Sequence, residues 1–411
     1  MRSDVPESSL ETGYSWLVMI LSMVMASLSF GAVTTVPILM QPMAEQLGWA
    51  RSTLGLAHAL AMIGAGGTSL LIGYLADRRG FAVIALVAAA ATGFGLWMAS
   101  RAQLPWQLYA PYALLVGAIG QGTFFGPITA NVTHWFDRNR AFAMAVVMCG
   151  QSVGGLTIPV ALRGLAQAWG WRDAMATYAL VCLVCISLCA LVFLRAPPRP
   201  AAHAPLAHRG PLPEGSMLVF FGVCAVLVFL NTASFMVIAH LVAYGEELGL
   251  SPVRSASLLA LLLGMTLISR LFGGTLIDRD RTATVLFPCA LMIPLGTLIL
   301  TTGAGVFPWM LCGAVLFGFG YGGVFPVFAH LIRAAFPASV AGTWISAMFL
   351  SGFLAAALGS WSGGYLRDRG GDYTQTFMTS ATLGGIALVL SVLLLRGVIV
   401  RGGNMPALGK T

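Results

Sequence analysis

Apolar residues occur in this chain as long continuous stretches, and polar residues are confined to short breaks between them. A helical stretch of roughly 17–25 apolar residues is long enough to cross the hydrocarbon core of a bilayer. About twelve such stretches run over residues 14–38, 52–76, 81–100, 106–130, 140–163, 172–195, 215–243, 255–277, 283–302, 307–332, 339–364 and 373–396. The pattern predicts an all-α membrane protein with twelve transmembrane helices.

Composition and charge agree with this class and predict an orientation. The chain is 58% hydrophobic and only 9% charged, with a mean hydropathy of +0.86, so its core is expected in lipid. Fourteen Lys and Arg residues fall on the side of the termini and seven on the other side. Because basic loops stay in the cytoplasm, both termini are expected there, in a plasma (bacterial inner) membrane. The net charge of +8 is spread over these loops, so no nucleic acid is expected as a partner.

A polar, proline-rich segment, RAPPRPAAHAPLAHRGPLPEG at residues 195–215, divides the stretches six and six. Its prolines oppose a helix, and the N-terminus lacks the basic region of a cleaved signal peptide. We therefore predict a cytosolic tail at 1–13, a six-helix bundle at 14–195, a cytosolic linker at 196–214, a second six-helix bundle at 215–396 and a tail at 397–411.

Short sequences recur about 200 residues apart on the two sides of this segment. GYLADR at 73–78 matches GTLIDR at 274–279, and GQG at 120–122 matches GYG at 320–322. An internal repeat of this kind is typical of transporters built from two parallel bundles, with the substrate site near the midplane between them.

Arg270 lies inside the apolar stretch 255–277, and no Asp or Glu lies deep within any stretch. A charge on a spanning helix costs at least about 2.5–3.5 kcal/mol, so it faces the bundle interior or a wet cavity and needs a partner. A guanidinium is a permanent cation that holds a carboxylate through two hydrogen bonds, so an anionic substrate is the expected partner. The alternative is snorkelling toward Asp278, about 12 Å along the helix.

Helical spacing and the repeat add further candidates to the site. The predicted substrate-binding residues are Arg270, Thr266, Tyr321, Gln121, Phe325 and Phe349. Thr266 lies one turn before Arg270, and Gln121 is the repeat counterpart of Tyr321. Phe325 and Phe349 would supply apolar walls, although packing between helices is the alternative for both.

The run Gly73-Tyr74-Leu75-Ala76-Asp77-Arg78-Arg79-Gly80 resembles the cytoplasmic loop signature of the major facilitator superfamily. The resemblance covers the whole six-plus-six layout and implies that family's fold of two pseudo-twofold-related bundles. It also implies a gating role for Asp77, Arg78 and Arg138, because the charges of this loop lock the two halves together on the cytoplasmic side in that family. The alternative for each arginine is an ordinary positive-inside charge.

Two further runs resemble a narrower group. Glu11–Trp16 (ETGYSW) and Trp135–Ala143 (WFDRNRAFA) are similar to the two signatures of the monocarboxylate transporters. Arg270 falls where these proteins, and the related oxalate:formate antiporters, keep a substrate-binding arginine.

The chain also departs from this group. Thr34 and Thr266 stand where proton-coupled animal members have a lysine and an aspartate, so their proton route is not transferable. Residues 339–364 contain no counterpart of the second cation of the oxalate exchangers. One buried cation suits a monocarboxylate better than a dicarboxylate.

These observations predict a secondary active transporter of small organic monocarboxylates, lactate- or pyruvate-like, that works by alternating access as a monomer. The alternatives are a major facilitator exporter of drugs or larger metabolites and an organic anion exchanger. A proton is an open co-substrate, for which His58, His240 and His330 are the candidates and His240 is the best placed. A membrane histidine satisfied by a neighbouring hydroxyl is the structural alternative.

An enzyme is not expected, because the stretches contain no nucleophile with a base, no metal cluster and no paired acids. All seven cysteines fall in apolar stretches, where a thiol behaves as a small hydrophobe. Neither a cofactor nor a metal is expected.

Overall fold

The computed structural model describes residues 11–195, 197, 212–213, 215–277 and 282–401. Within these ranges, side chains are not described at Leu70, Asp77, Ala141, 271–277, 282–284, 338–343 and 397–401. The predicted tails and nearly all of the predicted linker therefore lie outside the described residues.

The described chain is helical almost throughout, as predicted. The first half contains α1 (Gly13–Leu47), α2 (Arg51–Arg79), α3 (Phe81–Ser100), a broken span formed by α4 (Pro105–Ala110), η1 (Pro111–Gln121), α5 (Gly126–Val132) and η2 (Thr133–Trp135), then α6 (Arg140–Trp169), α7 (Trp171–Ala190) and η3 (Leu191–Leu194). The second half contains α8 (Ser216–Glu247), α9 (Pro252–Ile277), α10 (Thr282–Thr302), α11 (Phe307–Ala335), α12 (Ala338–Gly370) and α13 (Thr374–Arg401).

Each of the twelve predicted stretches corresponds to one of these spans. Among the described residues, eleven spans are long and apolar enough to cross a membrane. The twelfth is α2, whose 29 residues contain the predicted stretch 52–76 and whose side chains at Leu70 and Asp77 lie outside the described residues. It packs against η1 of its own half and against α12 of the other half.

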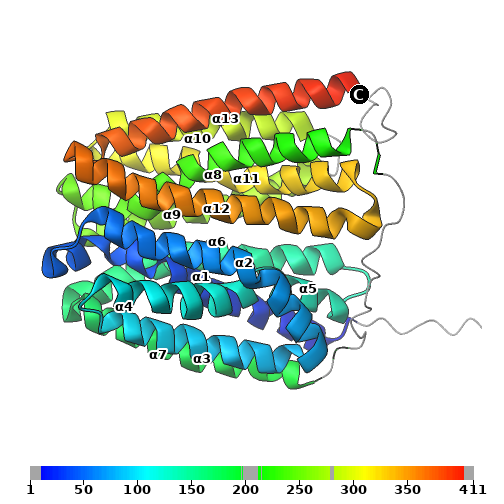
Figure 1. The fold of residues 1–411 in the computed structure, drawn as a ribbon, viewed down its shortest axis with the longest axis horizontal. Coiled ribbons are helices and arrows are strands. Elements are labelled where there is room, and N and C mark those ends of the chain that lie inside the picture. The colour runs from blue at the N-terminus through cyan, green and yellow to red at the C-terminus, as the bar shows by residue number, and fades with distance from the viewer. Residues whose placement is uncertain (1–10, 196, 198–211, 214, 278–281, 402–411) are drawn as a thin grey trace, which may run out of the picture.

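The helices of each half lie side by side along the long axis of the molecule (Figure 1). The first half forms one bundle and the second half forms the other. The chain enters α1 and leaves α13 at the same end (Figure 1), which we call the terminal end. The opposite end, where Leu47, Trp169, Glu247 and Gly370 close their helices, is the far end. The first helix therefore begins and the last helix ends at the same end of the molecule, and the cytoplasmic location of this end stays a prediction.

Glycines allow repeat-related helices to approach closely in both halves. A side chain at Gly117 would meet the backbone of Ala61 on α2, and one at Gly318 would meet the backbone of Leu262 on α9. Membrane helices pack through such small residues because lipid provides no hydrophobic force between them. The glycine-rich repeats therefore act in packing between helices.

Charged side chains join the halves at the far end. The Arg163 guanidinium on α6 donates from Nε and Nη2 to the two carboxylate oxygens of Glu246 on α8, at 2.6 and 2.5 Å, with only 6% of each side chain exposed. The carboxylate of Asp368 on α12 accepts from the backbone N–H groups of Arg51 and Ser52, at 3.0 and 2.8 Å. An acidic group at the N-terminus of α2 is favoured by the orphan N–H groups there.

These contacts correct one sequence interpretation. The sequence interpretation gave Arg270 as the one charged side chain within the spans. Arg163, however, ends the stretch 140–163, and α6 and α8 continue to Trp169 and Glu247. Arg163 and Glu246 consequently lie on spanning helices and are buried. Their long helices bring both charged groups to the same level between the bundles.

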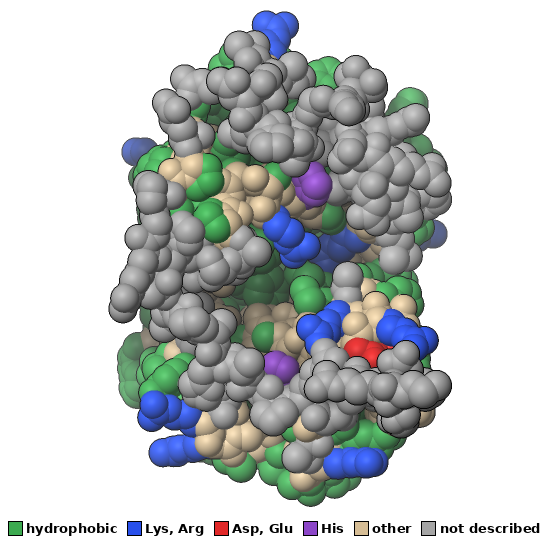
Figure 2. Space-filling view, turned by 90° about the vertical axis from the view of Figure 1, so that its right-hand side faces the viewer, with side chains coloured by type: hydrophobic (Ala, Val, Ile, Leu, Met, Phe, Trp, Pro, Cys, Tyr) green, Lys and Arg blue, Asp and Glu red, His purple; other side chains and the backbone are tan. Residues whose placement is uncertain are grey.

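The terminal end differs from the far end. Figure 2, which looks at the terminal end, shows a hollow between the two halves, with hydrophobic side chains inside it and Lys, Arg and His side chains at its rim. The structure is therefore closed between the halves at the far end and hollow at the terminal end.

We expect Glu246→Gln to open the far end. Removing one member of a buried ion pair costs about 3–5 kcal/mol because the other charge is left unpaired, and this cost falls only on the closed state. A spin-label pair at Gln103→Cys and Val253→Cys, in a background without native thiols, should show a shift to longer distances. Glu247→Gln, which removes the partly exposed pair with Arg367, is the matched control and should leave the distances unchanged. A closed far end in Glu246→Gln would contradict the assignment of this pair as the closing contact.

Candidate functional site

Arg270 lies between the two halves and is incompletely paired. Its Nη1 donates to the carbonyl of Met148 on α6, at 3.2 Å. Its Nε is buried and has no hydrogen-bond partner among the described residues. The ionisable groups close enough to interact electrostatically with it are Tyr321 and Cys149, and neither carries a charge at neutral pH. The alternative partner, Asp278, lies outside the described residues.

Thr266 joins the halves one turn from Arg270. Its hydroxyl donates to the carbonyl of Leu263, at 2.6 Å, and lies 2.6 Å from the hydroxyl of Ser152 on α6. A hydroxyl that donates to a carbonyl can accept from a second hydroxyl, so Ser152 is the donor in this pair. Thr266 is thus engaged between α9 and α6, beside the predicted anion anchor.

Aromatic side chains from both halves extend from Tyr321, in a row that we call the aromatic wall: Tyr321, Phe325, Phe349, Phe125 and Phe353. Successive ring centroids lie 5.2 Å apart for Tyr321–Phe325, 6.4 Å for Phe325–Phe349, 5.4 Å for Phe349–Phe125 and 5.2 Å for Phe125–Phe353. The four phenylalanines are only partly buried. The structure therefore brings predicted residues Phe325 and Phe349 to one surface with Tyr321.

Phe125 and Phe353 were missed by the sequence interpretation. Phe125 lies on the first-half segment that repeats the Tyr321 region and occupies the counterpart position of Phe325, so the repeat contained a signal for it. Phe353 is one helical turn after Phe349 on α12. Both belong to the contact between the halves.

Gln121 lies apart from the Arg270 group among the described contacts. It is 2% exposed, and its Oε1 accepts from the hydroxyl of Ser29 on α1, at 2.8 Å. The hydrogen bond gives its buried amide a partner within the first half. Its predicted contact with substrate stays a prediction.

The predicted gating residues are distributed over the terminal end. The side chain of Asp77 lies outside the described residues. The Arg78 guanidinium lies 4.5 Å from the ring centroid of Tyr74, and Arg138 is exposed. Their gating role stays a prediction. His240, the predicted proton-coupling residue, lies far from these groups: its Nε2 donates to the carbonyl of Ser360 on α12, at 2.8 Å.

The two signature runs of the sequence meet at the terminal end. The Glu11 carboxylate accepts from the backbone N–H groups of Arg138 and Asn139, both at 2.7 Å, and from the Asn139 side chain at 2.6 Å. The Tyr14 ring packs on Trp135 with centroids 5.4 Å apart. Glu11 therefore binds the N-terminal end of α6, the helix that carries Met148 and Ser152. Desolvation acts in the opposite direction, but the hydrogen bonds from Asn139 and Arg138 lower the pKa of Glu11.

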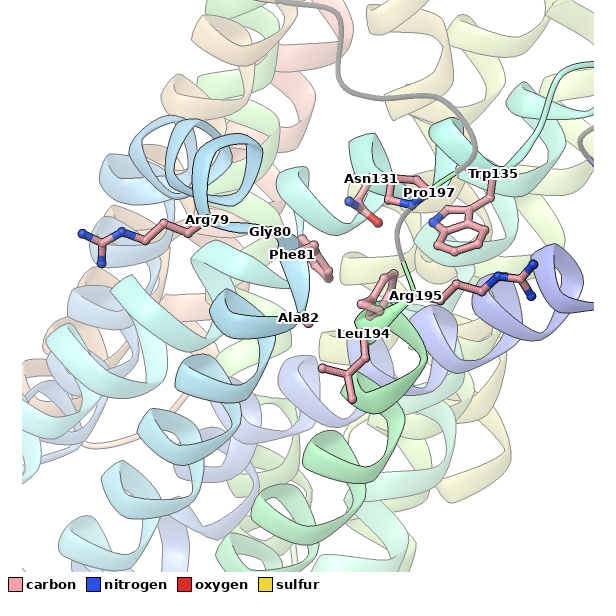
Figure 3. A pocket seen from close by; sticks show the side chains of 10 residues that line it. Arg79, Gly80, Phe81, Ala82, Asn131, Trp135, Leu194, Arg195 and Pro197 are labelled. Carbon is pink, nitrogen blue, oxygen red and sulfur yellow. The ribbon is translucent and has the colours of Figure 1, made fainter.

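A cavity of about 290 Å³ lies at the terminal end of the first half (Figure 3). Its lining includes Phe81, Asn131 and Trp135, while the guanidinium groups of Arg79 and Arg195 point away from its centre (Figure 3). It does not include Arg270 and so is not the predicted substrate site. Across the described residues, no three His, Cys, Asp or Glu side chains gather where they could hold a metal ion.

Sequence comparison places the chain in a class of membrane transporters. It matches the Major Facilitator Superfamily over residues 19–360 and again over 221–403. The chain belongs to this superfamily and is a multi-pass membrane transporter with its two-bundle fold.

Individual relatives are more distant. The chain is 25% identical over 403 residues to the MFS transporter asaE of Aspergillus flavus, covering 94% of this chain and 89% of the relative. It is 24% identical over 397 residues to monocarboxylate transporter 13 of Rattus norvegicus, covering 92% and 87%. Its fold is similar to that of a bacterial homolog of the human lysosomal transporter Spinster, with a TM-score of 0.74, 16% identity, and coverage of 95% and 98%.

Glu11→Ala should lower the thermal stability of the detergent-solubilised protein in a pH-dependent manner. Because the pKa of Glu11 is lowered on folding, its contribution is present above the ordinary value of 4.5 and is lost as pH falls through the lowered pKa. We expect a decrease in Tm of about 1–2 °C at pH 7 that narrows below pH 4.5. Glu45→Ala, at an exposed position on α1, is the control and should change Tm little. An equal decrease for Glu11→Ala at both pH values would exclude a role for the carboxylate charge.

Proposed function

We propose that this protein is a secondary active transporter of small organic monocarboxylate anions, lactate- or pyruvate-like, which it moves across the plasma membrane by alternating access with both termini in the cytoplasm. The observation that carries the proposal is the Arg270 side chain, which lies between the halves with a buried Nε that has no partner among the described residues. A carboxylate would supply that partner.

The surroundings of Arg270 support a ligand with one charge and an apolar body. Tyr321 can offer a hydroxyl next to the guanidinium, and the aromatic wall continues from its ring. Among the described side chains that interact electrostatically with Arg270 there is no second cation. Apolar lining with a few placed polar groups is the usual composition of a small-molecule site.

Binding of the anion to Arg270 would affect how easily the two halves close around the site. Arg270 and Thr266 belong to α9, and their contacts Met148 and Ser152 belong to α6, so the site is made at the sliding contact between the halves. An anion that pairs with Arg270 lowers the cost of burying this guanidinium when the hollow at the terminal end closes. Substrate binding thereby favours the change of state that transport requires.

Names of relatives agree with two candidate functions. Monocarboxylate transporter 11 of Homo sapiens is 25% identical over 92% of this chain, which supports the carboxylate substrate. Agnestins efflux protein AgnL12 of Paecilomyces divaricatus is 25% identical over 62% of this chain, and the aromatic wall would suit a larger metabolite. Uptake into proteoliposomes of a panel of labelled acids and larger anionic metabolites, with and without a pH gradient, separates the two and tests proton coupling.

Arg270→Lys should abolish most transport while leaving expression and folding intact. Lysine keeps the positive charge but loses the planar fork that grips a carboxylate through two hydrogen bonds, and such substitutions are not conservative. We expect at least a tenfold loss of labelled monocarboxylate uptake at equal protein. Arg254→Lys is the matched control, because Arg254 is exposed on the same helix. Near-normal uptake by Arg270→Ala would show that the anion binds elsewhere.

Dicarboxylates should compete poorly with monocarboxylates. A second negative charge would enter the site with only Arg270 to balance it, at an effective cost of several kcal/mol. Since each 1.4 kcal/mol is a factor of ten in affinity, a preference of about a hundredfold is expected even when the second carboxylate is partly solvated. The measurement is competition by lactate and by succinate against a labelled monocarboxylate near pH 7. Equal competition by succinate would indicate a second cation at the site.

A further inference from the structure

A buried histidine joins the two halves at the far end. His58 on α2 is fully buried, and its Nδ1 lies 2.8 Å from the hydroxyl of Ser360 on α12. The ring stacks on that of Phe235 on α8, with centroids 5.9 Å apart. His58 therefore contacts the second half on two of its helices.

The neighbours of His58 determine where its proton lies. The Ser360 hydroxyl donates its single proton to the carbonyl of Gly55, at 3.2 Å. It then accepts the Nδ1–H of His58, which leaves Nε2 as an unprotonated lone pair. Nε2 is buried and has no hydrogen-bond partner among the described residues. A buried lone pair without a donor costs less than a buried N–H without an acceptor, so this tautomer is the preferred one.

His240 is placed differently. Its Nε2 donates to the Ser360 carbonyl at 2.8 Å, and its Nδ1 lies 3.3 Å from the hydroxyl of Tyr373. A tyrosine hydroxyl can donate to a neutral imidazole or accept from a charged one. His240 can therefore gain a proton and keep both hydrogen bonds, whereas a proton added to Nε2 of His58 would have no acceptor among the described residues.

Among the described residues, no acid is available to pair with a protonated His58. The charged and titratable groups around the two histidines are Arg51, Asp368, Tyr373 and the histidines themselves. The carboxylate of Asp368 already accepts from two backbone N–H groups at the start of α2, Arg51 is a cation, and Tyr373 contacts His240. A proton on Nε2 would create a buried cation whose N–H points at no acceptor among these groups.

We propose that His58 is a proton-binding site that controls the far end of the transporter: an unprotonated Nε2 permits closure, and a bound proton holds the halves apart. The proposal rests on the alternating access of the proposed function. When the far end opens, water reaches Nε2 and solvates the charged ring, so the open state binds the proton more tightly. By linkage, the proton favours the open state by the same factor.

The test is the distance between spin labels at Gln103→Cys and Val253→Cys, in lipid nanodiscs without substrate and in a background without native thiols. An imidazole in water titrates near pH 6.5, so the ratio of open to closed far end should rise about tenfold between pH 7.5 and pH 5.5. His58→Gln keeps an amide that can donate to Ser360 but cannot titrate, and should abolish this rise. His240→Gln is the matched control and should retain it.

Two results would overturn the proposal. One is a wild-type ratio that does not change between pH 5.5 and pH 7.5, a measurement that depends on no variant at His58. The other is a pH response that survives His58→Gln, particularly if His240→Gln removes it. Because no substrate is present, the outcome is independent of the anion site: Arg270→Ala should keep the full pH response even where its monocarboxylate uptake is lost.

Discussion

A cation held inside a membrane bundle needs a partner, and the arrangement of this protein follows from how each buried arginine meets that need. Arg163 has the carboxylate of Glu246, and Arg51 donates to the carbonyl of Met40. The Arg163 pairing is complete only when the far end is closed. The Arg51 pairing requires only that α1 and α2 pack together within the first half. Arg270 has one carbonyl and an Nε without a partner among the described residues, so it alone among these three has capacity for a ligand. The closing contact and the binding site are thus distinguished by the completeness of their hydrogen bonding.

The contacts between the halves differ between the far end and the region around Arg270. At the far end, fixed charges and the His58–Ser360 bond hold α2 against α12 and α6 against α8. Near Arg270 the described contacts between halves are a single hydroxyl pair, a carbonyl and half-buried rings, none of which carries an opposing charge. When the halves separate near Arg270, no ion pair among these groups has to be broken. Such a contact can change in each transport cycle at low cost.

Much of the fold was accessible from the sequence, because bilayer thickness sets the length of each apolar stretch and the repeat relates one half to the other. Tyr321 was predicted as part of the same site as Arg270, and the two are close enough to interact electrostatically. The Arg163–Glu246 and His58–Ser360 contacts were not predicted, since their members lie 83 and 302 residues apart and meet only through the docking of the two bundles. The Ser29–Gln121 hydrogen bond was not predicted either, since its members lie 92 residues apart.

The two halves differ at Arg270, the residue proposed to bind the anion. The position four residues before GTLIDR is Arg270, and the equivalent position before GYLADR is Ser69, so only the second half carries the cation. On the proposed function, the anion would remain with α9 while the contacts contributed by α6 are exchanged around it. An empty transporter would have to bury Arg270 with the Met148 carbonyl as its partner among the described residues, whereas a loaded one buries a neutral pair. The same asymmetry therefore favours a return step with anion bound, and exchange of one monocarboxylate for another over net flux.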